Sequence, residues 1–216
     1  MAPSLRPDPA LPEELAHWFA GRGWRLRRHQ AEVLEHPGHA LVMADTGAGK
    51  TLAGFLPTLA EFCPSRLDGG APPRGVHTLY LSPLKALAHD VRRNLLAPVE
   101  ALGLKCRAEA RSGDTPAARK ARQRADPPEI LLTTPESLAL LLSWPEAEAL
   151  FSGLRRIVID EIHALAPGKR GDLAALALAR LHRLALRHDP QRRPAEHVRQ
   201  DLRPDLGEGP QLRRRR

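Results

Sequence analysis

The stretch A-L-V-M-A-D-T-G-A-G-K-T, Ala40 to Thr51, constrains this chain more than any other part of its sequence. Its apolar beginning, Ala40–Met43, predicts a buried strand. A loop with Gly47 and Gly49 follows, and helix-forming residues come directly after it. Glycines there let backbone N–H groups approach a phosphate closely, and the start of the next helix adds partial positive charge. The order strand, loop and helix therefore predicts a phosphate-binding loop.

The end of this loop supplies side chains suited to Mg·ATP. Lys50 can reach the β- and γ-phosphates, and the Thr51 hydroxyl can be a ligand of Mg²⁺. The first loop position is Ala44, whereas the general pattern G-x-x-x-x-G-K-S/T begins with glycine. The alternative is a glycine-rich turn that only begins a helix. The predicted ATP-binding residues of the loop are Ala44, Thr46, Gly47, Ala48, Gly49, Lys50 and Thr51.

A pair of acidic residues follows another apolar run later in the chain. Residues 156–159 predict a strand, and D-E-I-H, Asp160 to His163, comes directly after it. ATP hydrolysis needs a carboxylate that holds Mg²⁺ and a group that orients or deprotonates the attacking water. We assign Asp160 to the metal and Glu161 to the water, with His163 coupling the nucleotide site to the nucleic-acid side. The alternative is a chance D-E-x-H at a helix start.

Length, charge and cysteine usage limit the class of protein. The chain has 216 residues, which suits one domain with tails. Its formal net charge of +8 favours a polyanionic partner, with a generically basic surface as the alternative. Cys63 and Cys106 show neither zinc-type spacing nor a disulfide pattern, so we expect a reducing cytoplasm. No segment resembles a signal peptide or is long enough to span a membrane.

Predicted strands and helices alternate along most of the chain. Besides Ala40–Met43, apolar runs predict strands at 77–81, 130–133 and 156–159, with helical patterns between them, and 104–111 is a further strand candidate. This alternation predicts right-handed βαβ units, and hence an α/β fold with a mostly parallel sheet, helices on both faces and ligands at the carboxyl ends of the strands. We expect a flexible tail at 1–10, one ATP-binding domain at 11–188 and a basic tail at 189–216.

Five motifs together resemble those of a DExH-box superfamily 2 helicase: A-D-T-G-A-G-K-T, S-P-L-K-A-L-A, S-G-D-T, T-T-P-E-S-L and D-E-I-H. The second and fourth are similar to the Lhr (large helicase-related) family. L-P-E-E-L-A-H-W-F-A-G-R-G-W and A-P-G-K-R-G-D-L resemble its ligase-associated bacterial branch. The resemblance runs from about Leu11 to Leu186. It implies the first RecA-like P-loop NTPase domain of a helicase that moves 3′ to 5′ on single-stranded DNA at the expense of ATP, with a role in DNA repair.

The resemblance also assigns roles outside the two ATP motifs. A glutamine upstream of the loop pairs with adenine in several helicase families, and Gln30 has that placement. Its amide suits N6 and N7 of adenine. The alternative is a surface glutamine on a helix, and we expect nearby Trp24 to pack in the interior.

The motifs between the loop and D-E-I-H imply contacts to phosphates and sugars of a nucleic acid, which position a strand without reading its sequence. The alternative for each is a helix cap or a turn. The implied residues are Ser82, Pro83, Leu84, Lys85, Gly113, Asp114, Thr115, Thr134, Pro135 and Glu136.

Two expected features of such a helicase do not occur in this sequence. One is a second RecA-like domain, which would supply an arginine finger. The other is a strand ending in S-A-T after the helix that begins near Gly171. Residues 189–216 are instead rich in Arg and Pro, which suggests disorder or a basic nucleic-acid arm. Our hypothesis is out-of-frame translation of a GC-rich gene, and it fails if neither other frame encodes an apolar strand followed by Ser-Ala-Thr.

We therefore predict ATP and Mg²⁺ as ligands and single-stranded or partly duplex DNA as the partner, without excluding RNA. We expect little or no unwinding by this chain alone. A non-catalytic nucleic-acid-binding module with a helicase-like surface is the alternative. A small-molecule kinase is disfavoured, because no acceptor site is recognisable.

Overall fold

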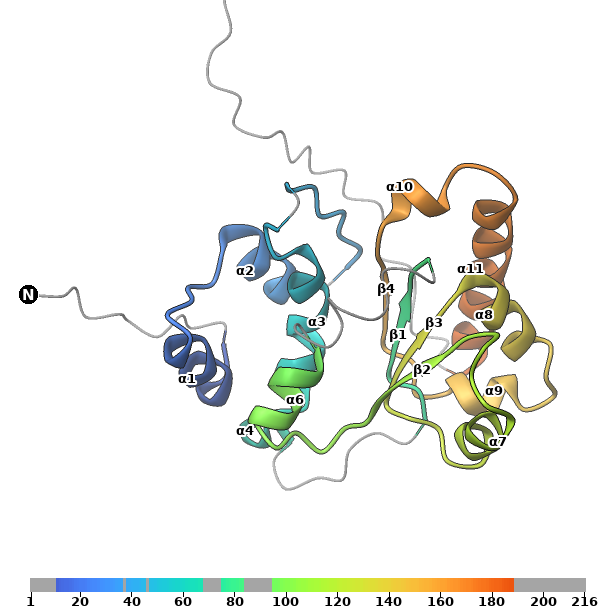
Figure 1. Cartoon of the computed structure of the whole chain (residues 1–216), viewed down its shortest axis with the longest axis horizontal. Helices are drawn as coiled ribbons and strands as arrows, with labels where there is room; N and C mark the ends of the chain where they lie inside the picture. Colours follow the sequence, from blue (N-terminus) through green and yellow to red (C-terminus); the bar gives the residue numbers. More distant parts are fainter. Residues whose placement is uncertain (1–10, 37, 46, 68–74, 84–94, 189–216) are drawn as a thin grey trace, which may run out of the picture.

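A four-stranded parallel sheet forms the middle of the molecule (Figure 1). The computed structural model describes residues 11–36, 38–45, 47–67, 75–83 and 95–188. The sheet order is β2-β3-β1-β4, and every neighbouring pair of strands is parallel. The strands are β1 (Thr78–Leu81), β2 (Ala108–Arg111), β3 (Ile130–Thr133) and β4 (Arg156–Ile159). The predicted parallel α/β fold is confirmed.

The two central strands are apolar on both faces, as expected for a sheet covered by helices on each side. Successive side chains of a strand point to opposite faces. Tyr80 and Leu132 therefore lie in one hydrophobic core, and Leu79 and Leu131 lie in the other. All four side chains are at least 98% buried. Because of this alternation along β1, the Tyr80 ring points toward the helix that begins at the end of residues 44–51, the predicted ATP-binding loop, which we call the ATP loop.

The first core lies between the sheet and the helices at the left of Figure 1. Leu15, Trp18 and Phe19 of the first helix are buried in it. Trp24 packs edge-on against Trp18 and Phe19, which confirms its predicted packing role. The helices of this layer are α1 (Glu13–Gly21), α2 (Arg28–Glu35), α3 (Lys50–Glu61), α4 (Pro64–Leu67) and α6 (Ala97–Ala101).

The second core lies under the helices on the other side of the sheet (Figure 1). Thr134 caps α8 by accepting the Ser137 amide, and Pro135 occupies the first helical turn. The long final helix packs against α8. The elements on this side are α7 (Ala117–Ala125), α8 (Pro135–Leu142), α9 (Ala147–Phe151), α10 (Ile162–Leu165) and α11 (Lys169–His188).

The predicted strand at Ala40–Met43 is wrong. Residues 38–45 have no regular secondary structure, and the side chains of Leu41 and Met43 are 63% and 79% exposed. Residues 38–45 are not paired with the free edge of β4, the last strand on one side of the described sheet. A short apolar run becomes a strand only where adjacent backbone accepts its hydrogen bonds, and the local sequence does not specify that partner.

Several predictions lie outside the described residues. These are the two tails, 1–10 and 189–216, and the site residues Thr46, Leu84 and Lys85. Among the helices of the described ranges, none has the length and apolar character needed to cross a membrane.

Candidate active site

The loops that follow the four strands meet at one edge of the sheet, because the strands are parallel. Ser82 follows β1, Gly113 lies beyond β2, Thr134 follows β3, and Asp160 follows β4. This shared edge contains every described strand-end residue that the motifs singled out.

The ATP loop ends where α3 begins. Gly47 and Gly49 have φ angles of 81° and 79°, in the left-handed region that favours glycine. Gly49 is the N-cap of α3, and Lys50 is its first residue. The Lys50 ammonium donates hydrogen bonds to the carbonyl oxygens of Ala44, at 2.5 Å, and Asp45, at 3.0 Å. The lysine is thus folded back over the loop, within the region that a phosphate would enter.

Asp160 lies beside the start of α3. The Thr51 hydroxyl donates to Asp160 Oδ2 at 3.2 Å, and the Glu161 amide donates to Oδ1 at 2.8 Å. Adjacent ligands of a Mg²⁺ octahedron with metal–oxygen distances of about 2.1 Å lie about 3 Å apart. The hydroxyl and the carboxylate therefore fit a shared Mg²⁺. No group of three His, Cys, Asp or Glu side chains in the described ranges could hold a metal, so phosphate and water would complete the shell.

Glu161 has a left-handed backbone, with φ of 50°, and is the single non-glycine residue with positive φ among those described. This conformation is unfavourable by about 1–3 kcal/mol, and such strain clusters at functional sites. The Glu161 side chain is 41% exposed, and its carboxylate lies 3.1 Å from His163 Nε2. The predicted water-orienting carboxylate therefore faces solvent next to an exposed histidine.

Gln30 is 97% buried and contacts the loop rather than solvent. Its Nε2 donates to the Gly49 carbonyl at 3.2 Å, and its Oε1 accepts the Arg27 amide at 3.0 Å. A Cβ on Gly49 would lie 2.7 Å from Gln30 Nε2. The Gln30 amide therefore stabilises the loop at Gly49. Adenine pairing by Gln30 stays a prediction.

The implied nucleic-acid residues divide by exposure. Ser82, Thr134 and Pro135 are buried, and Thr134 caps a helix, while Gly113 and Asp114 are exposed. The Glu136 carboxylate accepts a hydrogen bond from Arg170 at 2.7 Å.

Burial alone would raise the pKa of Glu136. Hydrogen bonds from its own backbone amide, the Thr134 hydroxyl and Arg170 outweigh that effect, so its pKa is lowered. Glu136 is therefore held as an anion, and phosphate contacts in this region would come from backbone and hydroxyl donors rather than from its side chain.

A family model for the DEAD/DEAH box helicase matches residues 27–195. The chain belongs to the DEAD/DEAH box helicase family. Within that family its sequence is similar to Lhr helicases, which confirms the resemblance drawn from the motifs. It is 38% identical over 209 residues to the Lhr helicase/uracil glycosylase of Escherichia coli, a match that covers 85% of this chain and 13% of that protein.

Two further comparisons agree. The Lhr helicase/probable uracil glycosylase of Mycolicibacterium smegmatis is 44% identical over 163 residues, covering 70% of this chain and 10% of that protein. The structure of Mycobacterium smegmatis helicase Lhr bound to ssDNA and AMP-PNP superposes with a TM-score of 0.72 at 35% identity, covering 83% of this chain and 24% of that chain. This helicase chain therefore spans a small part of the length of its relatives.

Sequence reasoning missed two residues of this helicase domain. Tyr80 donates its hydroxyl to Asp160 Oδ2 at 2.5 Å. The Lys120 ammonium donates to the Gly113 carbonyl at 2.7 Å, next to the exposed Gly113–Asp114 turn. Tyr80 carried only the signal of a strand residue, and Lys120 only that of a basic helix face, so neither contact could be found from the sequence.

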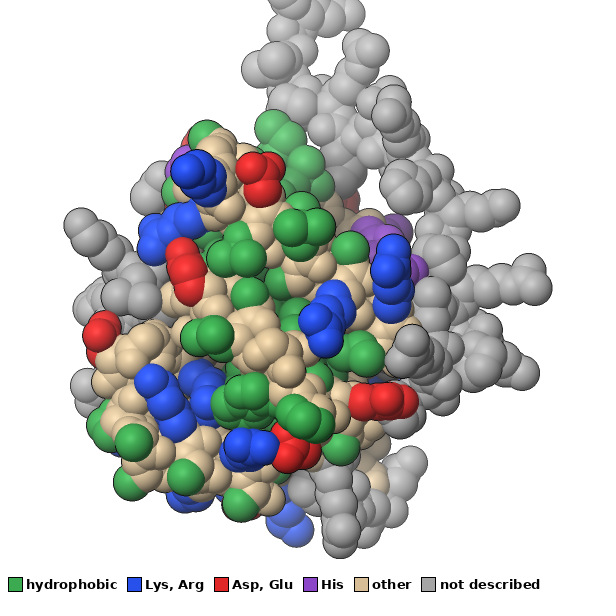
Figure 2. Space-filling model, turned by 90° about the vertical axis from the view of Figure 1, so that its right-hand side faces the viewer, with side chains coloured by type: hydrophobic (Ala, Val, Ile, Leu, Met, Phe, Trp, Pro, Cys, Tyr) green, Lys and Arg blue, Asp and Glu red, His purple; other side chains and the backbone are tan. Residues whose placement is uncertain are grey.

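The face formed by α7, α8, α9 and α11 carries Lys and Arg side chains interspersed with hydrophobic ones (Figure 2). On the described part of this face, the cations are scattered rather than gathered into one track. The net positive charge of the helicase therefore does not mark a nucleic-acid path on this side, and the strand-end loops remain the better candidates.

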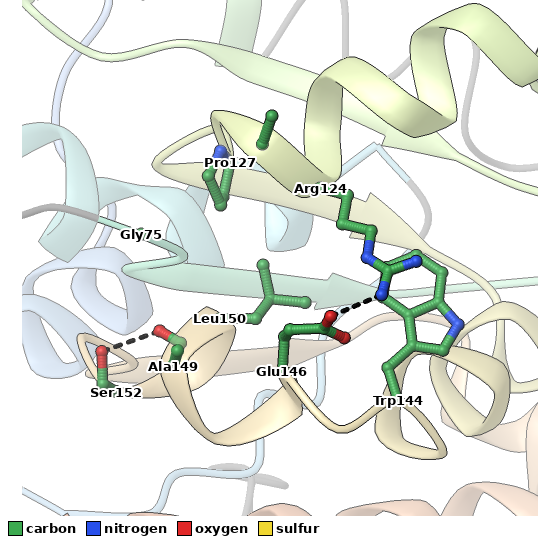
Figure 3. Close-up of a pocket in the computed structure, with 9 residues that line it drawn as sticks. Gly75, Arg124, Pro127, Trp144, Glu146, Ala149, Leu150 and Ser152 are labelled. Carbon is green, nitrogen blue, oxygen red and sulfur yellow. Dashed lines mark hydrogen bonds and ion pairs between the residues drawn. The ribbon is translucent and has the colours of Figure 1, made fainter.

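A pocket of about 350 Å³ lies away from the ATP loop (Figure 3). Gly75, Pro127 and Ser152 line it, and they precede β1, β3 and β4, so it lies at the opposite edge of the sheet. Arg124 pairs with Glu146 at 2.5 Å and stacks over the Trp144 ring. These contacts join α7 to α9, which makes the pocket a packing feature of the helicase domain.

Proposed function

We propose that this chain is the first motor domain of an Lhr-type DNA helicase. In the intact protein it would couple ATP hydrolysis to 3′-to-5′ translocation on single-stranded DNA, in the cytoplasm and in DNA repair. The hydrogen bond between Thr51 and Asp160 supports this most strongly. It joins the lysine loop to the acidic motif across 109 residues of sequence, at the edge of the sheet where ligands bind.

Each group at this edge has a role in the proposed reaction. The Lys50 ammonium exchanges the loop carbonyls of Ala44 and Asp45 for phosphate oxygens. Thr51 and Asp160 would hold Mg²⁺, which neutralises charge on the β- and γ-phosphates when bound. Glu161, whose carboxylate is partly exposed, orients the attacking water. Its neighbour His163 links this carboxylate to the nucleic-acid side.

We propose that the strand-end loops hold DNA through its backbone. The exposed turn at Gly113 and Asp114 is braced by Lys120 and lies at the same sheet edge as the ATP loop. The ssDNA in the related mycobacterial structure favours DNA as the partner. RNA is the alternative partner, because no side chain that would read a 2′-hydroxyl is identifiable.

We further propose that turnover requires a second RecA-like domain that contributes an arginine to the ATP site. This chain alone should bind Mg·ATP and nucleic acid weakly and unwind little or no duplex. The chain spans only 13% and 10% of the length of the Escherichia coli and Mycolicibacterium smegmatis Lhr proteins. This supports a motor that is built from more than this domain.

Binding of Mg·ATP to a Lys50→Ala variant tests the proposal. Loss of a hydrogen bond from a charged group weakens binding by about 1.5–3 kcal/mol, which is about tenfold or more in affinity. Lys105→Ala removes an exposed lysine elsewhere and should bind like the wild type. Equal affinity of the Lys50→Ala variant and the wild type would refute the phosphate assignment. If the wild type binds DNA but does not bind Mg·ATP, the alternative function, a non-catalytic nucleic-acid-binding module, is favoured.

A further inference from the structure

Tyr80 joins the metal carboxylate to the sheet. It is the one tyrosine in the chain, and its side chain is fully buried. Its hydroxyl donates to Asp160 Oδ2 at 2.5 Å, on the same oxygen that accepts the Thr51 hydroxyl. The Glu161 amide occupies the other carboxylate oxygen. Two side-chain donors and one backbone donor thus fix the orientation of the Asp160 carboxylate.

The helix that carries the metal hydroxyl also holds the tyrosine ring. The Tyr80 ring stacks on Phe55, with ring centroids 5.0 Å apart and planes at 24°. Phe55 lies one turn after Thr51 on α3, on the same side of the helix. The stack therefore links the Tyr80 ring to the helix that carries Thr51, so both side-chain donors to Asp160 are held by the same packing.

Packing alone does not explain the hydroxyl. A phenylalanine at position 80 would fill the same space and stack on Phe55 without a polar group that has to be satisfied in the interior. A buried hydroxyl without a partner is unfavourable by about 1–3 kcal/mol, so the site depends on Asp160 to accept this hydrogen bond.

We propose that Tyr80 is a positioning residue, which orients Asp160 for Mg²⁺ and thereby sets the Mg²⁺ concentration needed to bind ATP. The proposal rests on the nucleotide site proposed above. Thr51 and Asp160 would both be ligands of a bound Mg²⁺, and the Tyr80 hydroxyl would stay bonded to Oδ2 of Asp160. An arriving cation then meets a carboxylate that is already oriented, with less conformational freedom to lose.

A Tyr80→Phe variant tests this in the whole 216-residue chain. Binding of a fluorescent ATP analogue is measured while Mg²⁺ is titrated, and again in EDTA. Partners that orient a metal ligand affect metal affinity by about 10–100-fold. We expect the Mg²⁺ midpoint to rise about tenfold. Binding in EDTA should stay unchanged. Ser143→Ala, which removes an exposed hydroxyl bonded to the Leu140 carbonyl, should leave the Mg²⁺ midpoint at its wild-type value.

A second measurement uses the single tyrosine directly. Incorporated 3-fluorotyrosine places one ¹⁹F nucleus at position 80. Its resonance should shift with Mg²⁺ and nucleotide together but much less with nucleotide in EDTA.

The possible results separate the two proposals. If the wild type binds Mg·ATP and Tyr80→Phe has the same Mg²⁺ midpoint as the wild type, the positioning role of Tyr80 is wrong. The proposed ATP site is then unaffected. Equal weakening of that variant with Mg²⁺ and in EDTA would show a merely structural role. Absence of any nucleotide binding by the wild type would overturn the ATP site and the role of Tyr80 with it.

Discussion

Gly54 lets α3 lie directly against β4, and a methyl group there should disturb the ATP site from a distance. A Cβ on Gly54 would be 2.8 Å from Val158 Cγ1, whereas ordinary contact begins at 3.4 Å. Gly54→Ala therefore has to separate helix and strand by about 0.6 Å at this point. α3 begins with Lys50 and Thr51, which we propose bind phosphate and metal, and β4 leads into Asp160. The gap between Thr51 and Asp160 should widen.

The expected loss of stability is the difference between two effects. Overpacking a core contact is unfavourable by about 1–3 kcal/mol. Val158 is β-branched and has little rotamer freedom with which to yield. Replacing a glycine inside a helix by alanine returns about 0.5–1 kcal/mol. We expect the free energy of unfolding to fall by about 1 kcal/mol, which is the difference between the midpoints of these two estimates.

Urea denaturation and Mg·ATP binding measure the two consequences. Gly21→Ala is the matched control, because Gly21 also belongs to a helix but a Cβ added to it would have no atom within 4 Å. It should be neutral or slightly stabilising. Adding Val158→Ala to Gly54→Ala should recover part of the lost affinity, since the double variant restores space, and contacting residues couple by about 0.5–3 kcal/mol. A Gly54→Ala variant as stable as Gly21→Ala, with wild-type Mg·ATP affinity, would refute the contact argument.

Two other predictions concern stability and chemical reactivity. Burial opposes ionisation of Glu61, but hydrogen bonds and charges of His77 and Arg156 outweigh it and lower the pKa from 4.5 to about 2. This stabilisation is complete above pH 4.5 and is lost as pH falls toward 2, so wild type should lose about 1–2 kcal/mol more than Glu61→Gln across that range, after discounting for solvent screening. Equal losses in the free energy of unfolding of the wild type and Glu61→Gln on acidification would contradict this. Burial raises the pKa of the Cys63 and Cys106 thiols to about 12, so maleimide should label them slowly at pH 8 and rapidly in urea. Fast labelling of the native chain would show that the first core opens.

The sequence predicts strands β3 and β4 and the loops that follow them. Residues 130–133 and 156–159 are apolar runs that the structure pairs with β1, and the parallel order places Asp160 beside α3. The Thr51–Asp160 contact follows from that topology, because carboxyl ends of parallel strands share one edge.

What the sequence could not predict depends on distant partners. Ala40–Met43 has the composition of a strand but pairs with no described strand, and Leu41 and Met43 are exposed. The Tyr80–Asp160 contact spans 80 residues and depends on the angle at which a ring leaves β1. The buried position of Gln30 depends on how α2 packs against α3, which local periodicity does not specify.

The outer side of β4 has a practical consequence. Ile157 and Ile159 are 38% and 36% exposed, and β4 pairs only with β1 among the described strands. Since no other described strand pairs with the outer edge of β4, its backbone donors and acceptors can pair with other extended chains. Concentrated solutions of this protein should therefore cluster through β4, and a lysine introduced at Ile157 should keep the molecules apart.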